Sequence, residues 1–190
     1  MAKSLNLTGD READELLTSN PFALLVGMLL DQQVPMEVAF SGPLRLEQRL
    51  GNDLAPATIA AMEPDRLEAI FRDKPAIHRY PGSMAKRVHA LATSLVEEYG
   101  GDAAAVWRDA ASGSDLKRRL TSLPGFGDQK ARIFIALLGK QYGVTPDGWR
   151  EAAGEYGEVG HRSIADVTDE DTLARVREFK RARKASSDTG

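Results

Sequence analysis

One short turn constrains the fold of this chain more than any other feature. It reads Leu123-Pro124-Gly125-Phe126-Gly127. A tight Pro-Gly-aromatic-Gly turn that opens a helix leaves backbone N–H groups free at the N-terminus of that helix. These donors and the positive end of the helix dipole favour an anion, and the glycines let a phosphate come close to the backbone. The turn therefore predicts a phosphate-binding site formed by Gly125, Phe126 and Gly127, with the Phe126 ring anchoring the turn in the core.

Helical patterns account for the rest of the chain. Residues 21–33 follow the capping residue Asn20 and are apolar on nearly every side, so this helix should be buried. No stretch shows the alternation of a half-buried strand, so the predicted fold class is all-α. Further helices are expected from residue 35 onward with an interruption near Gly42-Pro43, and at about residues 57–62, 64–71, 83–99, 103–109, 114–122, 128–142, 147–153 and 171–184.

The composition limits the class of protein. The chain has 190 residues, enough for one domain or for two small lobes that share a core. It has no cysteine, which excludes disulfides, thiolate metal sites and a cysteine nucleophile. Its three histidines lack the spacing of metal ligands. No signal segment or membrane span is apparent, and nothing requires an oligomer. We therefore expect a monomeric, cytoplasmic protein with no membrane contact.

The charge distribution bears on a nucleic-acid partner. The net charge of −3 argues mildly against one, since DNA-binding domains usually carry a basic face. Acidic residues, however, concentrate at residues 10–15 and 166–171. The basic C-terminal helix at 171–184 could be a solvated face or a DNA contact, and both interpretations stay open. The basic residues near the turn and in this helix are Lys117, Arg118, Arg119, Lys130, Arg132, Arg175, Arg177, Lys180, Arg181, Arg183 and Lys184.

Four segments together resemble one known family. They are Leu29-Leu30-Asp31-Gln32-Gln33, the looser Arg79-Tyr80-Pro81-Gly82-Ser83-Met84-Ala85, the hairpin from Leu123 to Arg132, and Asp147 at a set distance after it. On these motifs the chain from about Asn20 to Trp149 resembles the HhH-GPD family of base-excision DNA glycosylases, the endonuclease III and 3-methyladenine glycosylase II group. The combination is specific at family level, whereas such hairpins alone also occur in ligases, polymerases and nuclease subunits.

The resemblance carries expectations about architecture and cofactors. It implies one domain of two helical lobes over residues 1–190, with a helix-hairpin-helix at about 114–143, the basic helix at 171–184 and a flexible tail at 186–190. The partner is then double-stranded DNA. Many endonuclease III relatives hold an iron–sulfur cluster on four C-terminal cysteines, which this chain lacks, so we expect no such cofactor. The backbone carbonyls of Ser122 and Leu123 are candidate ligands for a monovalent cation.

Asp147 is the candidate catalytic carboxylate. Breaking an N-glycosidic bond builds positive charge on the sugar, and an ionised carboxylate beside it stabilises that charge and can orient the attacking water. Asp147 stands at a predicted helix start, in Thr145-Pro146-Asp147-Gly148-Trp149, where the dipole favours the charged form. Its own neighbourhood equally fits a helix cap. The resemblance adds the catalytic interpretation.

Gln129 stands where the resemblance places the lysine of bifunctional members. An amide cannot form an imine with the sugar. The following Lys130 is about 100° further around the helix, so we expect it to face a phosphate or solvent instead. The pair therefore predicts a monofunctional enzyme without a lyase step. Gln129 can contact the extruded nucleotide or lie on the surface.

Gln33 and Asp31 are further candidates at the DNA. The resemblance places Gln33 near the gap that an extruded base leaves, where an amide can bond the orphan base edge. The alternative for this glutamine is a polar helix end. Asp31 is a candidate for the wall of the base pocket.

Three aromatic residues are candidate stacking surfaces for an extruded base. They are Tyr80, Phe40 and Trp149, of which Trp149 is favoured because it follows Asp147 closely. Alkylated purines carry positive charge, which aromatic faces attract. Each of the three can instead be plain core.

Three functions are compatible with the sequence. The first is a monofunctional DNA glycosylase that removes a damaged base, with alkylated bases as one candidate class. The second is a non-catalytic helix-hairpin-helix module that recognises damaged or distorted DNA, which the missing lysine and the acidic net charge favour. The third is a helical protein–protein adaptor on a glycosylase scaffold.

Overall fold

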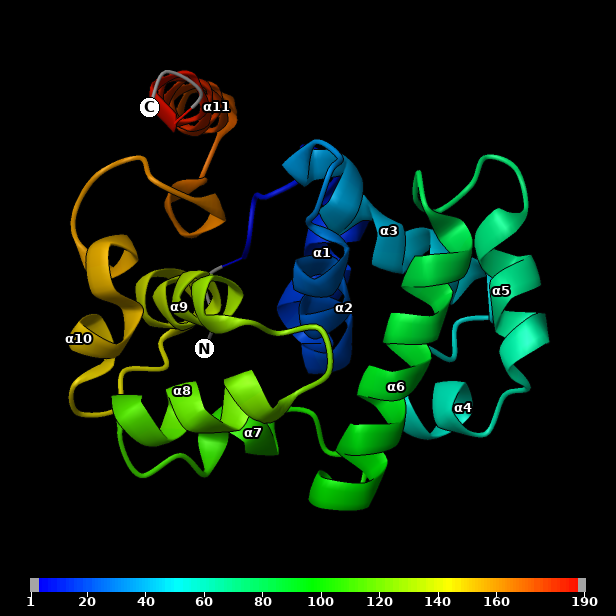
Figure 1. The fold of residues 1–190 in the computed structure, drawn as a ribbon. Coiled ribbons are helices and arrows are strands. Elements are labelled where there is room, and N and C mark those ends of the chain that lie inside the picture. Colours follow the sequence, from blue (N-terminus) through cyan, green and yellow to red (C-terminus); the bar gives the residue numbers. More distant parts are fainter. Residues whose placement is uncertain (1–3, 188–190) are drawn as a thin grey trace.

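The structure, a computed structural model, describes residues 4–187, and this part of the chain consists of helices and loops without strands (Figure 1). The all-α prediction is confirmed. Within the described part, no helix is both long and apolar enough to cross a membrane. The elements are α1 (Arg11–Ser19), α2 (Pro21–Leu30), α3 (Met36–Arg49), α4 (Pro56–Ala60), α5 (Pro64–Arg72), α6 (Pro81–Tyr99), α7 (Ala105–Arg108), α8 (Gly113–Ser122), α9 (Asp128–Leu137), η1 (Leu138–Tyr142), α10 (Trp149–Ala153), η2 (Gly154–Gly157), η3 (Ile164–Asp166) and α11 (Glu170–Ser187).

Helix α2 is the centre of the first lobe, which comprises α1 to α6. The Asn20 side chain accepts hydrogen bonds from the amides of Phe22 and Ala23 and so caps the helix. Every residue of α2 after its first proline is buried. Gly27 allows close packing on α3, because a Cβ there would lie 2.7 Å from the Phe40 ring. The helix therefore becomes a rigid support for the loop that follows it.

Helix α9 has the same role in the second lobe, which comprises α7 to α11. Its Phe134 ring meets the hairpin residue Phe126 edge-on, with 5.9 Å between ring centroids. Both rings are buried, and α8 and α10 pack on α9 and on each other. One continuous apolar core runs through both lobes, so the hairpin is fixed relative to α2.

Helix α11 lies on the outside of the molecule, at the top left of Figure 1. Val176 is its one buried residue. Two ion pairs tie it down, Arg177 to Glu37 of α3 and Arg183 to Glu155 of η2, the latter at 2.8 Å. Because exposed ion pairs contribute little stability, these two pairs and the small apolar contact at Val176 attach α11 only weakly.

Several predicted boundaries were wrong. Helix α2 ends at Leu30 rather than residue 33, α6 begins at Pro81 rather than Ser83, and Pro43 lies inside the continuous α3. Each of these predictions was based on local residue preferences, and the packing of the apolar helix faces overrides such preferences. Helix α11 continues to Ser187, so residues 186–187 of the predicted flexible tail are helical, and 188–190 lie outside the described residues.

Candidate functional site

A cavity of about 500 Å³ lies between the lobes and gathers predicted site residues from distant parts of the sequence. Asp31 and Gln33 enter it from the loop after α2, and Gln129 and Lys130 enter it from the first turn of α9. We call it the interlobe pocket. Its other lining residues are Met28, Gln32, Val34, Ile133, Tyr156, Arg162, Phe179, Lys180, Arg183, Lys184 and Ser187.

A buried histidine, His78, holds the loop that follows α2 through the backbone of that loop. His78 Nε2 lies 3.1 Å from the carbonyl oxygens of both Leu30 and Gln32, and burial lowers the pKa of His78. Arg87 of α6 donates to the Gln32 side chain at 2.9 Å. Neither residue was predicted from the sequence, because no local motif marks a side chain that bonds a partner 46 or more residues away. The loop is therefore a positioned element of the site.

Gln33 is exposed on this loop in a left-handed backbone conformation, with φ of +56°. It does not end a helix, as one of the two predicted alternatives required. Non-glycine residues rarely adopt positive φ, and those that do concentrate at functional sites. The anchored loop thus presents an amide outward at the rim of the interlobe pocket.

Lys130 crosses from α9 to the end of α2. Its Nζ donates to the Leu29 carbonyl at 3.0 Å, and burial lowers its pKa to about 8, against the smaller opposing influence of Asp31. The expected exposed lysine is in fact half-buried in the pocket wall. This ammonium group therefore links the hairpin lobe to the α2 lobe at the base of the site.

Asp31 is the one acidic residue among the described residues that line the interlobe pocket. Burial raises the pKa of its carboxyl group, and the charges of Lys180 and Lys130 act in the opposite direction. No described residue donates a hydrogen bond to this carboxylate. Its charge is therefore available to a ligand.

Gln129 points across the pocket to η2. Its side-chain amide donates to the hydroxyl of Tyr156 at 3.0 Å. The Tyr156 ring is buried and, with the half-buried Phe179 of α11, adds aromatic surface to the pocket. Neither aromatic residue was predicted from the sequence, because both follow the segment where the recognised motifs end.

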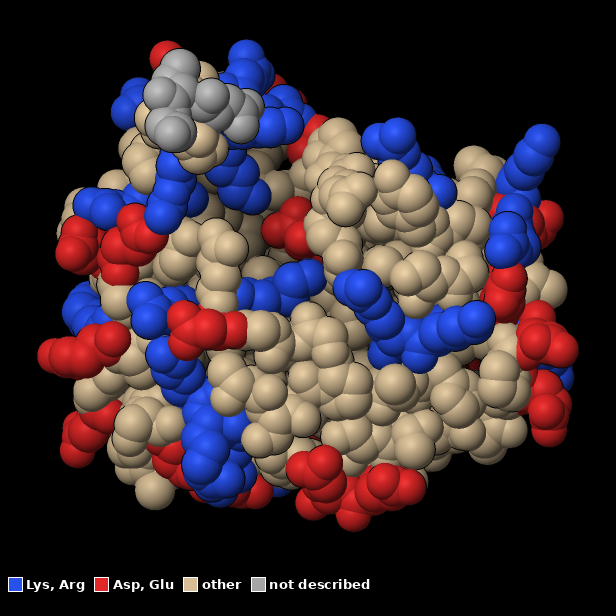
Figure 2. All heavy atoms as spheres, in the orientation of Figure 1, with Lys and Arg blue, Asp and Glu red and all other residues tan. Residues whose placement is uncertain are grey.

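Basic side chains of α11 cover one side of the interlobe pocket. Lys180, Arg183 and Lys184 all line it. Figure 2 shows the lysine and arginine side chains of α11 at the top left, above a hollow in this face. Arg183 is paired with Glu155, whereas Lys180 and Lys184 have no ion-pair partner among the described residues. The predominance of positive charge favours a polyanionic ligand.

The hairpin has the geometry of an anion site. Gly125 requires its glycine, because its φ is +85° and a Cβ would come within 3.0 Å of Leu29. Gly127 has ordinary dihedral angles, and a Cβ there would meet no protein atom within 4 Å. No described residue accepts a hydrogen bond from the amides of Gly127, Asp128 or Gln129. The space and the donors at Gly127 therefore face outward.

Phe126 was expected among the DNA-binding residues, yet its ring and its backbone amide both contact other parts of the protein. Its ring is buried against Phe134, and its amide donates to the Leu123 carbonyl at 3.1 Å. That bond also occupies one of the two carbonyls predicted to hold a cation. The Ser122 carbonyl accepts no backbone hydrogen bond from outside its helix in the described part, and a cation at this turn stays a prediction.

Asp147 lies away from the interlobe pocket. It is exposed in a separate depression that Lys117, Arg118 and Asp128 also line. It does not cap a helix through its side chain, because Gly148 is the N-cap of α10, with φ of +76°. Its backbone carbonyl instead accepts the amide of Gly113 at 2.7 Å.

The three predicted stacking aromatics also lie outside the interlobe pocket. Trp149 is buried, packs directly on Gly139, and has the Arg150 guanidinium 4.4 Å from its ring. Phe40 is fully buried against Gly27. For Trp149 and Phe40 the stacking prediction was wrong, because their rings are buried in the hydrophobic core. Tyr80 is 41% exposed beside His78, next to the anchored loop, and remains a candidate for contact with DNA.

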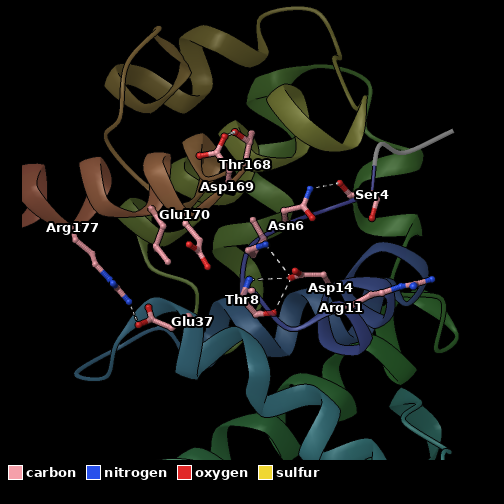
Figure 3. Close-up of a pocket in the computed structure, with 13 residues that line it drawn as sticks. Ser4, Asn6, Thr8, Arg11, Asp14, Glu37, Thr168, Asp169, Glu170 and Arg177 are labelled. Carbon is pink, nitrogen blue, oxygen red and sulfur yellow. Dashed lines mark hydrogen bonds and ion pairs between the residues drawn. The ribbon is translucent and has the colours of Figure 1, made fainter.

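A second cavity, of about 730 Å³, lies between residues 4–14, α3 and the start of α11 (Figure 3). Here the Asp14 carboxylate accepts bonds from the amides of Leu7 and Thr8 and from the Thr8 hydroxyl, at 2.9 to 3.0 Å. Glu37 is paired with Arg177. Asp14 therefore attaches the N-terminal segment to α1, and the pair of Glu37 with Arg177 attaches α11 to α3.

Comparison with known proteins gives one result. A protein-family model described as "HhH-GPD superfamily base excision DNA repair protein" matches residues 26–187. The match extends through α11, beyond the segment where the motifs were recognised in the sequence. Searches of curated proteins and of solved structures found no significant match.

Proposed function

Because the chain belongs to the HhH-GPD superfamily of base excision DNA repair proteins, we propose that it is a monofunctional DNA glycosylase acting at the interlobe pocket. One observation carries this proposal: Asp31, Gln33, Gln129 and Lys130, chosen from the sequence, line one cavity between the lobes. The reaction is hydrolysis of the bond between a damaged base and its deoxyribose in double-stranded DNA. We further propose that the protein is a cytoplasmic monomer that associates with the DNA of the nucleoid.

The geometry supports separate roles for the backbone and the base. The outward amides at Gly127 would hold one phosphate, and the α11 lysines would contact another part of the backbone. Gln33 would enter the gap left by the extruded nucleotide. Tyr156 and Phe179 would offer aromatic surface to the base, which favours electron-poor bases such as alkylated purines.

Hydrolysis by water is favoured over chemistry through an imine. Gln129 bears an amide, and that amide bonds Tyr156. The Lys130 Nζ donates to the Leu29 carbonyl, so it is held against α2. We propose that Lys130 positions the two lobes and that no strand cleavage accompanies base release.

The assay that tests this function uses duplexes with alkylated, deaminated or oxidised bases. Abasic sites are scored by hot-alkali cleavage, with parallel samples left without alkali and others treated with borohydride. We expect strand breaks only after alkali and no borohydride cross-link. A cross-link that disappears in Lys130→Ala would replace the monofunctional proposal with a lyase. The sequence-based candidate Asp147 is tested in the same assay as Asp147→Asn.

The second candidate is a non-catalytic module that binds damaged DNA. The observation that favours it is the position of Asp147 in a depression outside the interlobe pocket. It predicts binding to lesion-bearing duplexes that weakens steeply with salt, without base release. A protein–protein adaptor, in contrast, would bind no duplex at any salt concentration.

A further inference from the structure

A glycosylase reaction at the interlobe pocket requires a carboxylate there, and the pocket has one. Of the described residues that line it, Asp31 alone is acidic. We propose that Asp31 is the catalytic carboxylate, which stabilises the sugar cation and accepts the proton of the attacking water. This inference rests on the proposed function. It assigns the role of catalytic carboxylate to Asp31 instead of Asp147, and Asp31 precedes the hairpin by more than 90 residues.

The position of Asp31 is fixed while its carboxylate is left without a partner. Asp31 is the C-cap residue of α2, and its amide donates to the Met28 carbonyl at 3.3 Å. The next residues are held by His78 and Arg87. The backbone at Asp31 is thus constrained on both sides, although no described residue donates to its side chain.

Other carboxylates near the lobe contacts are engaged. Asp14 accepts three hydrogen bonds on one oxygen, and Glu37 is paired with Arg177. Asp128 is paired with Lys117 at 2.7 Å. A partly buried carboxylate without such bonds is costly to stability, and groups of this kind concentrate at functional sites.

The positive charges around Asp31 favour its ionised form, the form that can stabilise a sugar cation. Burial raises the pKa of Asp31, because a partly dehydrated carboxylate is less stable when charged. Lys130 and Lys180 counteract that shift and favour the ionised form. Arg162, Arg183 and Lys184 also line the pocket, on the side of η2 and α11, and His78 lies behind the loop. A weakly hydrated carboxylate attracts positive charge more strongly than one in water.

The proposed step balances as follows. The bond between the sugar C1′ and the base nitrogen breaks, and its electron pair leaves with the base. Positive charge develops on the sugar opposite the Asp31 carboxylate. The oxygen of a water molecule bonds to C1′ and one water proton passes to Asp31, which later releases it to the departed base or to solvent. The products are a free base and an abasic site.

The test measures single-turnover base release from the substrate that the duplex panel identifies. We expect Asp31→Asn to slow release by about 100-fold or more while the affinity for that duplex stays within about twofold. Asp31→Glu should recover part of the rate. The matched control is Asp65→Asn, an exposed change in the first turn of α5, which should leave the rate within about twofold of wild type.

A pH profile separates catalysis from a structural role. The wild-type rate should fall as pH is lowered through the raised pKa of Asp31, at a higher pH than an ordinary aspartate would give, and Asp31→Asn should lose this limb. Release by Asp31→Asn within about twofold of wild type would overturn the proposal and leave the glycosylase function standing. A wild-type protein that releases no base from any duplex would overturn both.

Discussion

At the scale of single residues, Gln33 combines backbone strain with exposure. A left-handed glutamine costs about 1 kcal/mol or more, and a glycine would remove that cost. His78 bonds the backbone carbonyls of Leu30 and Gln32, and Arg87 bonds the Gln32 side chain, while Gln33 keeps its positive φ. We propose that contact of this side chain with DNA is the use that outweighs the conformational cost.

Replacing Gln33 with glycine should separate stability from function. We expect Gln33→Gly to keep the free energy of unfolding within about 0.5 kcal/mol of wild type or to raise it, because relief of strain offsets the entropy of glycine. Duplex affinity and base release should both fall. Asn52→Gly is the matched control, since Asn52 also has positive φ, at +65°, but does not line the interlobe pocket. Unchanged DNA binding by Gln33→Gly would contradict its role.

At the scale of elements, the hairpin was predictable and the segment after it was not. The glycines and proline of the hairpin act through local geometry, which sequence encodes directly. The place of Asp147 depends on two turns, at Gly143 and Gly148, which both have φ of +76° and which a count of residues does not describe. Trp149 then docks on Gly139 and carries Asp147 to another face. Asp31 was found because the loop after α2 carries its own motif.

The two hairpin glycines should respond differently to alanine. Gly125→Ala should lower the free energy of unfolding by about 1–2 kcal/mol, because its φ is positive and Leu29 is close. Gly127→Ala should leave stability nearly unchanged, since its Cβ meets no protein atom, yet it should weaken duplex binding by blocking the phosphate. Thermal unfolding and duplex titration measure the two effects. Equal duplex affinity for Gly127→Ala and wild type would place the phosphate elsewhere.

At the scale of the whole molecule, the acidic net charge conceals a local basic surface. The net charge is −3, yet α11 places three basic side chains at the interlobe pocket, and its few apolar contacts leave its basic side chains exposed. Figure 2 shows acidic side chains gathered at the lower rim of the same face instead. DNA would therefore be guided toward the hollow between the lobes by the arrangement of charge rather than by its total.

The basic face of α11 should appear in the salt dependence of binding. Lys180→Ala/Lys184→Ala should weaken duplex binding at low salt and reduce the slope of log affinity against log salt by about 2, if each lysine meets one phosphate. The control is Arg11→Ala/Arg66→Ala, which removes two exposed charges on α1 and α5. An identical slope for the α11 variant and wild type would show that Lys180 and Lys184 do not contact the DNA phosphates.

The central claim is that this protein breaks a bond between a base and its sugar at the interlobe pocket. The most direct measurement is mass spectrometry of free bases released from lesion-bearing duplexes by excess wild-type protein. The account predicts one free damaged base per lesion, with the strand intact until alkali is added. Salt-sensitive duplex binding without any free base above the protein-free control would contradict it, and would identify the protein as a damage-binding module.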